Sequence, residues 1–153
     1  MSAAMEWVLP DQEISRWNAA RVQIEPRPVT ASASAFVPVW VSSVATRLFE
    51  LLRLPNNWDS YGAAKPSVTS ALNLFTVLSA VASPDTPAPS IVPTTLGYFQ
   101  AEWHQNGADL EVEVVSPTRI LVSFSDAADA WDDVLSIDMT RLAQALRRIG
   151  RAP

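Results

Sequence analysis

The clearest pattern in the sequence is an alternation of apolar and polar residues in its last third. Residues 97–103, 108–115 and 119–125 alternate with a period of two, which is typical of strands with one buried face. Asn106-Gly107 lies between the first two segments, and this dipeptide favours a two-residue hairpin turn. The pattern therefore predicts a three-stranded antiparallel meander.

The register of this meander follows from its turns. A two-residue turn at Asn106-Gly107 brings apolar residues opposite one another, and a turn at residues 116–118 does the same for the second hairpin. The predicted pairs on the apolar face are Trp103 with Leu110, Ala101 with Val112, Phe99 with Val114, Val114 with Ile120, Val112 with Val122 and Leu110 with Phe124. A slip of one residue would turn all of these side chains outward, so the agreement of the two turns supports the register.

Helical periods lie on both sides of the meander. The first helix is expected between Pro38 and Pro55, with an apolar stripe of Val41, Val44, Leu48 and Leu51 from which Trp40 deviates. The second is expected from Pro66 to Pro84. Its main stripe is Val68, Ala71, Leu72, Phe75, Leu78 and Ala82, and a second apolar side is Leu74, Val77 and Val81. We therefore expect this helix to be covered on two faces.

The two ends of the chain complete the predicted organisation. Asp138 is expected to cap a C-terminal helix that presents Leu142, Ala143, Leu146 and Ile149 and ends at Gly150. Residues 1–37 show no sustained period, but Trp7 and Trp17 indicate an arm that completes the core or binds another chain. We predict an N-terminal arm and linker over residues 1–37 and one α+β domain over residues 38–153, with two N-terminal helices, a three-stranded meander and a C-terminal helix.

Composition narrows the chemistry available to this domain. The 153 residues are 48% hydrophobic, which suffices for one soluble domain with a core. The chain has no cysteine and one histidine, His104, and therefore lacks thiolate metal sites, a cysteine nucleophile and multi-histidine sites. No catalytic motif remains, so we expect a protein that is not an enzyme and needs no cofactor or metal.

Charge and hydropathy narrow the partners and the location. Residues 98–138 hold nine acidic residues and one basic residue, Arg119, which argues against a nucleic-acid interface. Residues 66–84 are uncharged but contain seven serine, threonine and asparagine side chains, which favours a buried helix over a membrane span. Residues 1–10 lack the pattern of a secretory leader, so we expect a cytoplasmic location.

The polar face of the predicted meander is the first candidate site. The register places Glu102 opposite Glu111, Gln100 opposite Glu113 and His104 opposite Asp109, and like charges that lie opposite one another destabilise a sheet. Three interpretations stand beside one another. The face is simply solvated, it docks a partner rich in arginine and lysine, or its carboxylates hold a hard divalent cation.

Two loops add aromatic candidates. Residues 56–64 join the first two helices and contain Trp58, Asp59 and Tyr61, which indicate either a structured connection or a recognition loop. Residues 125–134 combine four aspartates with Trp131, which is typical of an interaction loop. The predicted partner-binding set therefore has two parts. The two loops contribute Trp58, Asp59, Tyr61 and Trp131, and the first two predicted strands contribute Tyr98, Gln100, Glu102, Glu111 and Glu113.

A resemblance rests on two motifs. Asn57-Trp58-Asp59-Ser60-Tyr61-Gly62-Ala63 has the form N-W-D-x-x-G-A, and Gly97 to Glu102-Trp103 has the form G-x-x-x-x-E-W. In these motifs the chain resembles a group of small uncharacterised bacterial proteins over residues 50–125. The resemblance implies a small bacterial α+β domain and transfers no activity.

These observations lead to one functional expectation and two alternatives. We expect a non-enzymatic bacterial or phage protein that binds a basic protein partner through its acidic sheet face, of the antitoxin, immunity, inhibitor or defence-complex type. The first alternative is a metal-dependent hydrolase or nuclease that uses Asp59, Glu102, Glu111 and Glu113 as ligands. The second is a homo-oligomer formed through the apolar second helix.

Overall fold

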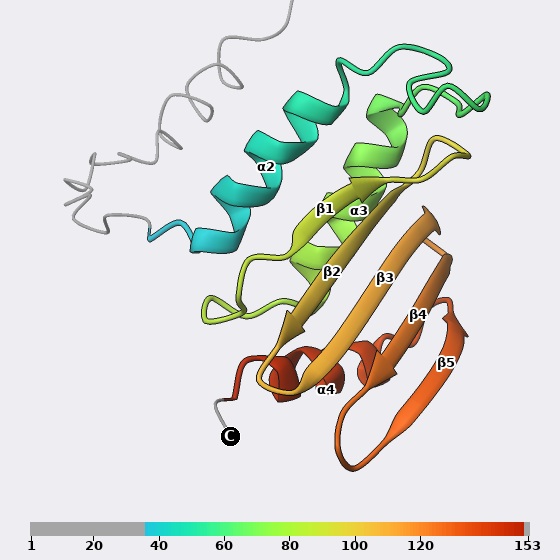
Figure 1. The fold of residues 1–153 in the computed structure, drawn as a ribbon. Coiled ribbons are helices and arrows are strands. Elements are labelled where there is room, and N and C mark those ends of the chain that lie inside the picture. The colour runs from blue at the N-terminus through green and yellow to red at the C-terminus, as the bar shows by residue number, and fades with distance from the viewer. Residues whose placement is uncertain (1–35, 152–153) are drawn as a thin grey trace, which may run out of the picture. The chain divides into compact units, whose positions relative to one another are not determined.

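The alternating segments form one antiparallel sheet in the computed structural model, which describes residues 36–151. Its five strands lie in chain order. They are β1 (Ser90–Pro93), β2 (Phe99–Gln105), β3 (Ala108–Ser116), β4 (Arg119–Ser125) and β5 (Ala130–Leu135). Helices α3 (Val68–Val81) and α4 (Thr140–Ile149) lie on one face of the sheet, and α2 (Val39–Leu51) lies beside α3 and β1 (Figure 1). The fold is α+β.

The predicted register is confirmed across β2, β3 and β4. All six apolar pairs form as expected, including Trp103 with Leu110 and Leu110 with Phe124. Asn106 and Gly107 take positive φ angles of 56° and 70°, as the two-residue hairpin turn requires. The second hairpin contains an irregularity between Val114 and Ser116, which leaves the register of the apolar pairs unchanged.

The predicted three-stranded meander is present but incomplete, because the sheet has two more strands. Strand β1 lies in a segment with four prolines between α3 and β2, Pro84, Pro87, Pro89 and Pro93. It pairs with β2 from Ser90 opposite Glu102 to Pro93 opposite Phe99. Proline lacks a donor, and an edge strand tolerates it. Strand β5 lies in the segment expected to be an interaction loop and pairs with β4.

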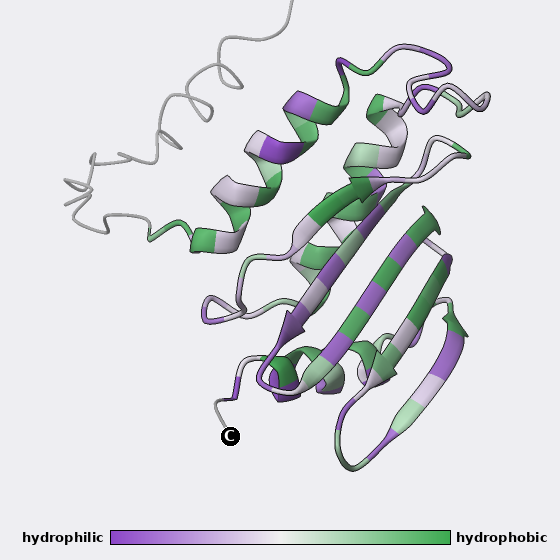
Figure 2. Ribbon diagram, viewed as in Figure 1, coloured by the Kyte–Doolittle hydropathy of each residue, from purple (hydrophilic) through white to green (hydrophobic). Residues whose placement is uncertain are grey.

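The sheet is amphipathic, as Figure 2 shows by the alternating colours along its strands. One face, which we call the covered face, packs against α3 and α4. Nine of its residues on β2, β3 and β4 are no more than 3% exposed. They are Phe99, Ala101, Trp103, Leu110, Val112, Val114, Ile120, Val122 and Phe124. This apolar layer is the centre of the hydrophobic core.

The stripe predicted for the first helix needs one correction. Trp40 was expected to lie off the stripe, but it is 5% exposed and its ring centroid lies 5.9 Å from that of Phe75. The buried face of α2 is Trp40, Val44, Leu48 and Leu51. Val41 is only partly buried. Because residues four apart lie on one helix face, Trp40 and Val44 point into the same core.

The buried side of the second helix combines part of the predicted main stripe, Ala71 and Leu78, with part of the predicted second side, Leu74 and Val77. Its buried residues are Ser70, Ala71, Leu74, Val77 and Leu78. Val68 and Leu72, which belong to the predicted main stripe, are each 62% exposed. Among the described residues, the expectation of cover on two faces is therefore met only in part, because the side with Val68 and Leu72 is open.

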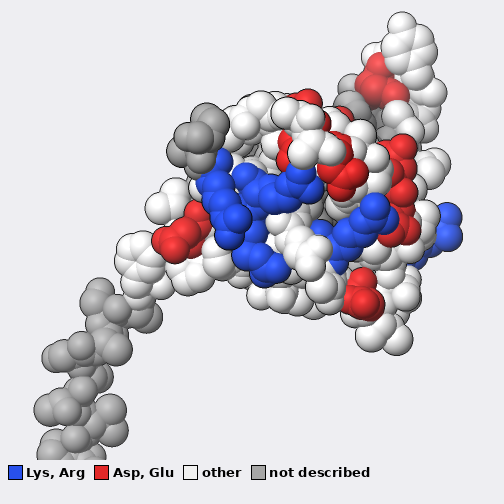
Figure 3. All heavy atoms as spheres, turned by 90° about the horizontal axis from the view of Figure 1, so that it is seen from below, with Lys and Arg blue, Asp and Glu red and all other residues white. Residues whose placement is uncertain are grey.

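The last helix begins slightly later than predicted. It starts at Thr140, and Met139 occupies the N-cap position without a side-chain hydrogen bond. Asp138 still contributes, because its Oδ1 accepts a hydrogen bond from the Thr140 N–H at 2.9 Å. Figure 3 views the molecule from below, where basic side chains gather with acidic ones beside them.

Both edges of the sheet are protected. At β1, Arg47 of α2 donates from Nε to the Ile91 carbonyl oxygen at 3.3 Å. At β5, Asp133 Oδ1 accepts a hydrogen bond from the Val134 N–H at 2.8 Å. Charged side chains and covered edges discourage the addition of another strand.

Two predictions remain, one on the N-terminal arm and one on membrane spans. The predicted arm with Trp7 and Trp17 lies outside the described residues. Within residues 36–151, none of the helices has the length and apolar character needed to cross a bilayer.

Candidate functional site

The face of the sheet opposite α3 and α4, which we call the open face, gathers the predicted carboxylates. Directly paired residues on neighbouring strands point to the same face. One row across the sheet is Ser90, Glu102, Glu111, Ser123 and Asp132, and the next is Val92, Gln100, Glu113, Leu121 and Val134. We call these the acidic row and the mixed row. Neither row contains lysine or arginine.

The opposed glutamates are held together by an amide. Gln100 Nε2 donates to Glu102 Oε1 and to Glu111 Oε2, both at 3.1 Å. Charge-assisted hydrogen bonds of this kind offset part of the repulsion between the two carboxylates. Gln100 therefore orders the acidic row and leaves its negative charge in place.

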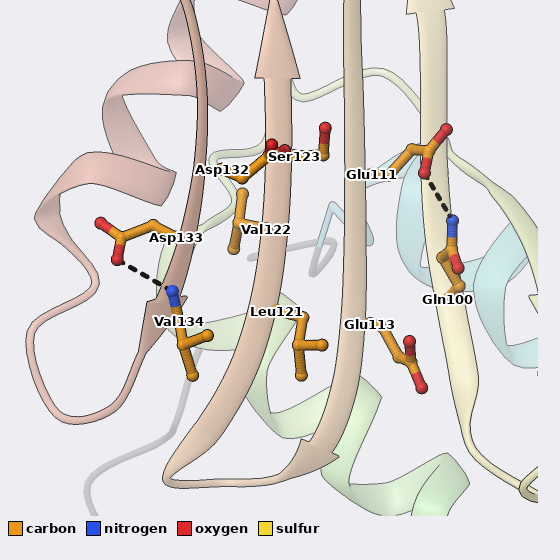
Figure 4. A pocket seen from close by; sticks show the side chains of 9 residues that line it. All are labelled: Gln100, Glu111, Glu113, Leu121, Val122, Ser123, Asp132, Asp133 and Val134. Carbon is orange, nitrogen blue, oxygen red and sulfur yellow. Dashed lines mark hydrogen bonds between the residues drawn. The ribbon is translucent and has the colours of Figure 1, made fainter.

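A shallow hollow lies over the strands next to these residues (Figure 4). Its volume is about 550 Å³, and its lining runs from Gln100, Glu111 and Glu113 across β4 to Asp132 and Val134. The hollow contains apolar side chains from Leu121 and Val134 as well as carboxylates. A surface of this composition can contact both the methylene groups and the charged ends of basic side chains.

His104 lies at one end of the open face between two carboxylates. Its Nδ1 is 2.7 Å from Asp109 Oδ1, and its Nε2 is 3.6 Å from Glu102 Oε2. The hydrogen bond with Asp109 raises the pKa of His104 above its usual value of 6.5, and the negative charges of Asp109 and Glu102 act in the same direction. The open face therefore carries a titratable positive charge beside its acidic row.

The loop over residues 56–64 is a hydrogen-bonded structure. Asp59 Oδ1 accepts from the backbone N–H groups of Tyr61 at 2.8 Å and Ala63 at 3.0 Å. Both bonds lower the pKa of the Asp59 carboxyl, and the bond from Ala63 has the larger effect. Asn57 Oδ1 accepts from the Gly62 N–H at 2.6 Å, and Asn57 itself has a positive φ of 60°. The asparagine and aspartate of the N-W-D-x-x-G-A motif thus shape the loop.

The loop contacts the turn that precedes β2. The Ala64 N–H donates to the Thr95 carbonyl oxygen at 2.8 Å. Gly97 has a φ of +84°, and a Cβ there would lie 3.0 Å from the Lys65 carbonyl oxygen. Glycine is thus required both by the backbone angle and by the close approach. The structure therefore joins the two motifs that are far apart in the sequence.

The remaining aromatic candidates lie apart from the acidic row. Trp58 is partly buried and donates from Nε1 to the Ala64 carbonyl oxygen at 3.3 Å. Tyr61 is 94% exposed on the loop, and Tyr98 lies in the turn, where its N–H donates to Thr94 Oγ1. These three residues belong to the end of the sheet at which the loop contacts the turn.

Trp131 lies on the covered face, so the structure does not bring it together with the acidic row. It pairs with Phe124 across β4 and β5, with 5.6 Å between the ring centroids. On its other side the Arg141 guanidinium lies 4.0 Å from the Trp131 ring centroid. Trp131 therefore links α4 to the covered face.

Six residues that line the hollow are outside the predicted set, three on β4 and three on β5, a strand that the sequence pattern did not predict. Asp132 and Val134 come from β5, and Ser123 and Leu121 are their partners on β4. The signal was the alternation of Trp131, Asp133 and Leu135, which Asp133 obscures because an acidic residue is unexpected on a covered face. Asp133 is accommodated there by Arg141, whose Nη1 lies 2.8 Å from Asp133 Oδ2.

The positions of the carboxylates bear on the metal hypothesis. Within residues 36–151, no group of three or more histidine, aspartate or glutamate side chains is arranged to share a metal ion. Asp59, one of the four ligands in that hypothesis, uses Oδ1 to bind its own loop. The described geometry thus offers the hypothesis no support.

Comparisons with protein-family models, with curated proteins and with solved structures find no match.

Proposed function

We propose that this protein is a non-enzymatic interaction module that binds a basic segment of another protein on the open face of its sheet. The observation that carries the proposal is the pair of adjacent rows across all five strands, in which the acidic row holds three carboxylates and the mixed row beside it holds one carboxylate and three apolar side chains, without a lysine or arginine in either row. The described helices pack on the opposite face or beside β1.

The charge of this face favours a basic partner. Glu102 on β2, Glu111 and Glu113 on β3 and Asp132 on β5 lie in the same two rows of the open face and add their fields over one surface. Complementary charge of this kind accelerates encounter and discriminates against acidic partners. The expected partner therefore presents several arginine or lysine side chains together.

The apolar residues of the mixed row supply the second requirement of an interface. Val134 is 56% exposed, and Leu121 lies beside it in the hollow. Binding energy at interfaces comes mainly from desolvated apolar and aromatic contacts, while charges at the rim direct orientation and rate. Basic side chains can cover Leu121 and Val134 with their methylene groups while their charged ends reach the carboxylates.

The protected edges also favour binding on the face. Arg47 covers the β1 edge and Asp133 binds an edge amide at β5, so strand addition is opposed at both. A partner is therefore expected to lie across the strands. An antitoxin, immunity, inhibitor or defence-complex role is compatible with this kind of surface.

The test begins with affinity capture from the source organism and identification of a stoichiometric partner. The dissociation constant of that partner is then measured for the wild type and for the triple variant Glu102→Gln, Glu111→Gln and Glu113→Gln. We expect the triple variant to weaken binding by about 100-fold, because three carboxylates that contact the partner are neutralised.

A matched control separates the face from net charge. The variant Glu50→Gln, Asp85→Asn and Asp129→Asn removes the same number of charges at positions outside the two rows. It is expected to keep wild-type affinity within about threefold, since distant exposed charges are screened. Equal weakening in both triple variants, or unchanged binding in the first, would contradict the proposal.

A further inference from the structure

The sole histidine of the chain, His104, lies against the acidic row of the open face. It follows Glu102 by two residues on β2, so the two side chains point to the same side of the sheet. His104 Nε2 lies 3.6 Å from Glu102 Oε2, and Nδ1 lies 2.7 Å from Asp109 Oδ1. The imidazole is thus placed between a carboxylate of the acidic row and a second carboxylate outside it.

The charges that face His104 come from its own strand and from β3. Glu102 lies on β2, Asp109 is the direct partner of His104 on β3, and Glu111 lies diagonally from it on β3. Residues 86–90, which lead into β1 on the other side of β2, are uncharged. Helix α4 packs on the covered face. Carboxylates alone therefore surround the imidazole among the described elements next to it, and they favour its protonated form.

The two oxygens of Glu102 have different neighbours. Oε1 accepts a hydrogen bond from Gln100 Nε2 at 3.1 Å, whereas Oε2 faces His104 Nε2. A protonated imidazole donates from both nitrogens, so it pairs with Asp109 and with Glu102 Oε2. A neutral imidazole that donates from Nδ1 to Asp109 has no proton for Oε2 and leaves this oxygen to a ligand. His104 and a basic ligand thus compete for one carboxylate oxygen.

Protonation also changes the charge that a ligand meets. The acidic row contains three carboxylates, Glu102, Glu111 and Asp132, and a positive charge at its end offsets part of their field. The change occurs near neutral pH, because the hydrogen bond with Asp109 is the largest of the causes that raise the pKa of His104 above 6.5. The imidazole side chain is half-exposed, so solvent protons reach it directly.

We propose that protonation of His104 competes with the basic partner for Glu102, so that the open face binds this partner more tightly above neutral pH and releases it as the pH falls. This inference rests on the proposed function and adds a regulation of the same surface. Linkage requires the converse as well: a ligand that prefers the neutral imidazole weakens proton binding at His104 by the same factor.

The first experiment uses a synthetic octa-arginine peptide with a fluorescent label on its amino terminus and an amidated carboxyl terminus. The charge of this probe is constant between about pH 5.5 and about pH 8.5. Fluorescence anisotropy at constant ionic strength gives its dissociation constant for the full-length protein. We expect the affinity of the wild type to fall about three- to fivefold from the higher pH to the lower, which is the size of effect that one exposed charge pair produces.

Two variants at the same position separate the imidazole from the carboxylates. His104→Gln cannot be protonated but leaves every carboxylate in place, so its affinity is expected to be nearly independent of pH over this range. His104→Lys carries a permanent positive charge, and at the higher pH it is expected to bind the peptide as weakly as the wild type does at the lower pH. Circular dichroism verifies that both variants are folded.

A second experiment measures the converse effect without relying on affinity. The single imidazole is titrated by NMR in the free protein and in the presence of saturating octa-arginine. We expect bound peptide to lower the titration midpoint of His104 by the logarithm of the affinity ratio found in the first experiment. An unchanged midpoint would contradict the proposed competition.

The outcomes distinguish this inference from the function on which it rests. The triple variant Glu102→Gln, Glu111→Gln and Glu113→Gln is titrated with the same peptide at the higher pH. Undiminished binding in the triple variant, or no binding by the wild type at any pH, would overturn the proposed function and the pH dependence with it. If the triple variant loses binding but the wild type and His104→Gln respond equally to pH, the function stands and the role of His104 is refuted.

Discussion

The two faces of the sheet are built from the same strands but obey different physical demands. On β4, Phe124 is 2% exposed, whereas the adjacent Ser123 is exposed on the open face. The covered face is selected by packing, because any change of volume there is transmitted to α3 and α4. None of the described helices packs on the open face. Its residues are therefore free of packing demands, and opposed carboxylates can lie there. This difference locates stability on one face and recognition on the other.

The largest expected effect is on the covered face. Phe124→Ala should lower the free energy of unfolding by about 3–5 kcal/mol, because it removes a buried ring and leaves a cavity. Ser123→Ala, the adjacent position on the open face, should change it by less than about 0.5 kcal/mol. Urea denaturation of both variants measures the contrast. Similar losses at the two positions would mean that the open face also contributes to packing.

The loop at the end of the sheet should give an intermediate effect. Gly97→Ala should lower the free energy of unfolding by about 2–4 kcal/mol, because alanine is strained at positive φ and its Cβ meets the Lys65 carbonyl oxygen. Gly107→Ala is the control, since its φ is +70° but nothing lies within 4 Å of the added Cβ. It should cost only about 1 kcal/mol. Thermal unfolding that ranks the two variants in the opposite order would refute the role of the close contact.

Removing a charge from the open face should raise stability slightly. Glu111→Gln relieves the opposition to Glu102 and keeps an oxygen that can accept from Gln100, so we expect a gain of about 0.2–1 kcal/mol. Gln100→Leu should have the opposite sign, because it removes the amide that bridges the two carboxylates. Chemical denaturation at low salt is the measurement, since screening weakens both effects. A loss on Glu111→Gln would show that this carboxylate stabilises the fold.

The smallest expected effect is a titration at the end of the open face. Because the folded state raises the pKa of His104 above 6.5, its protonated form contributes stability that is fully present below pH 6.5 and is lost as pH rises through the folded-state pKa. The sole histidine gives a single imidazole signal to follow by NMR. Asp109→Asn should move its midpoint back toward 6.5. An unchanged midpoint would remove Asp109 as the principal cause.

Much of this fold could be predicted wherever a pattern was strictly local. The register from Phe99 to Phe124 followed from alternation and from Asn106-Gly107, and the placement of Gln100, Glu102, Glu111 and Glu113 on one face came with it. The failures occurred where a contact with another helix or strand decides the structure. Asp133 is tolerated on the covered face because Arg141 of α4 pairs with it. Without knowledge of this pair, the acidic residue made the segment of β5 look like a loop.

The sequence by itself determined which residues share a face of the central strands and that this face is acidic, because side-chain direction in a strand depends only on the parity of position. The tertiary structure alone decided that β1 and β5 extend the sheet, that Trp131 packs beneath Arg141 and that Val68 and Leu72 stay exposed. A helix with apolar residues on two sides, such as α3, can bury either of them. Only the positions of its neighbours select the side that is covered.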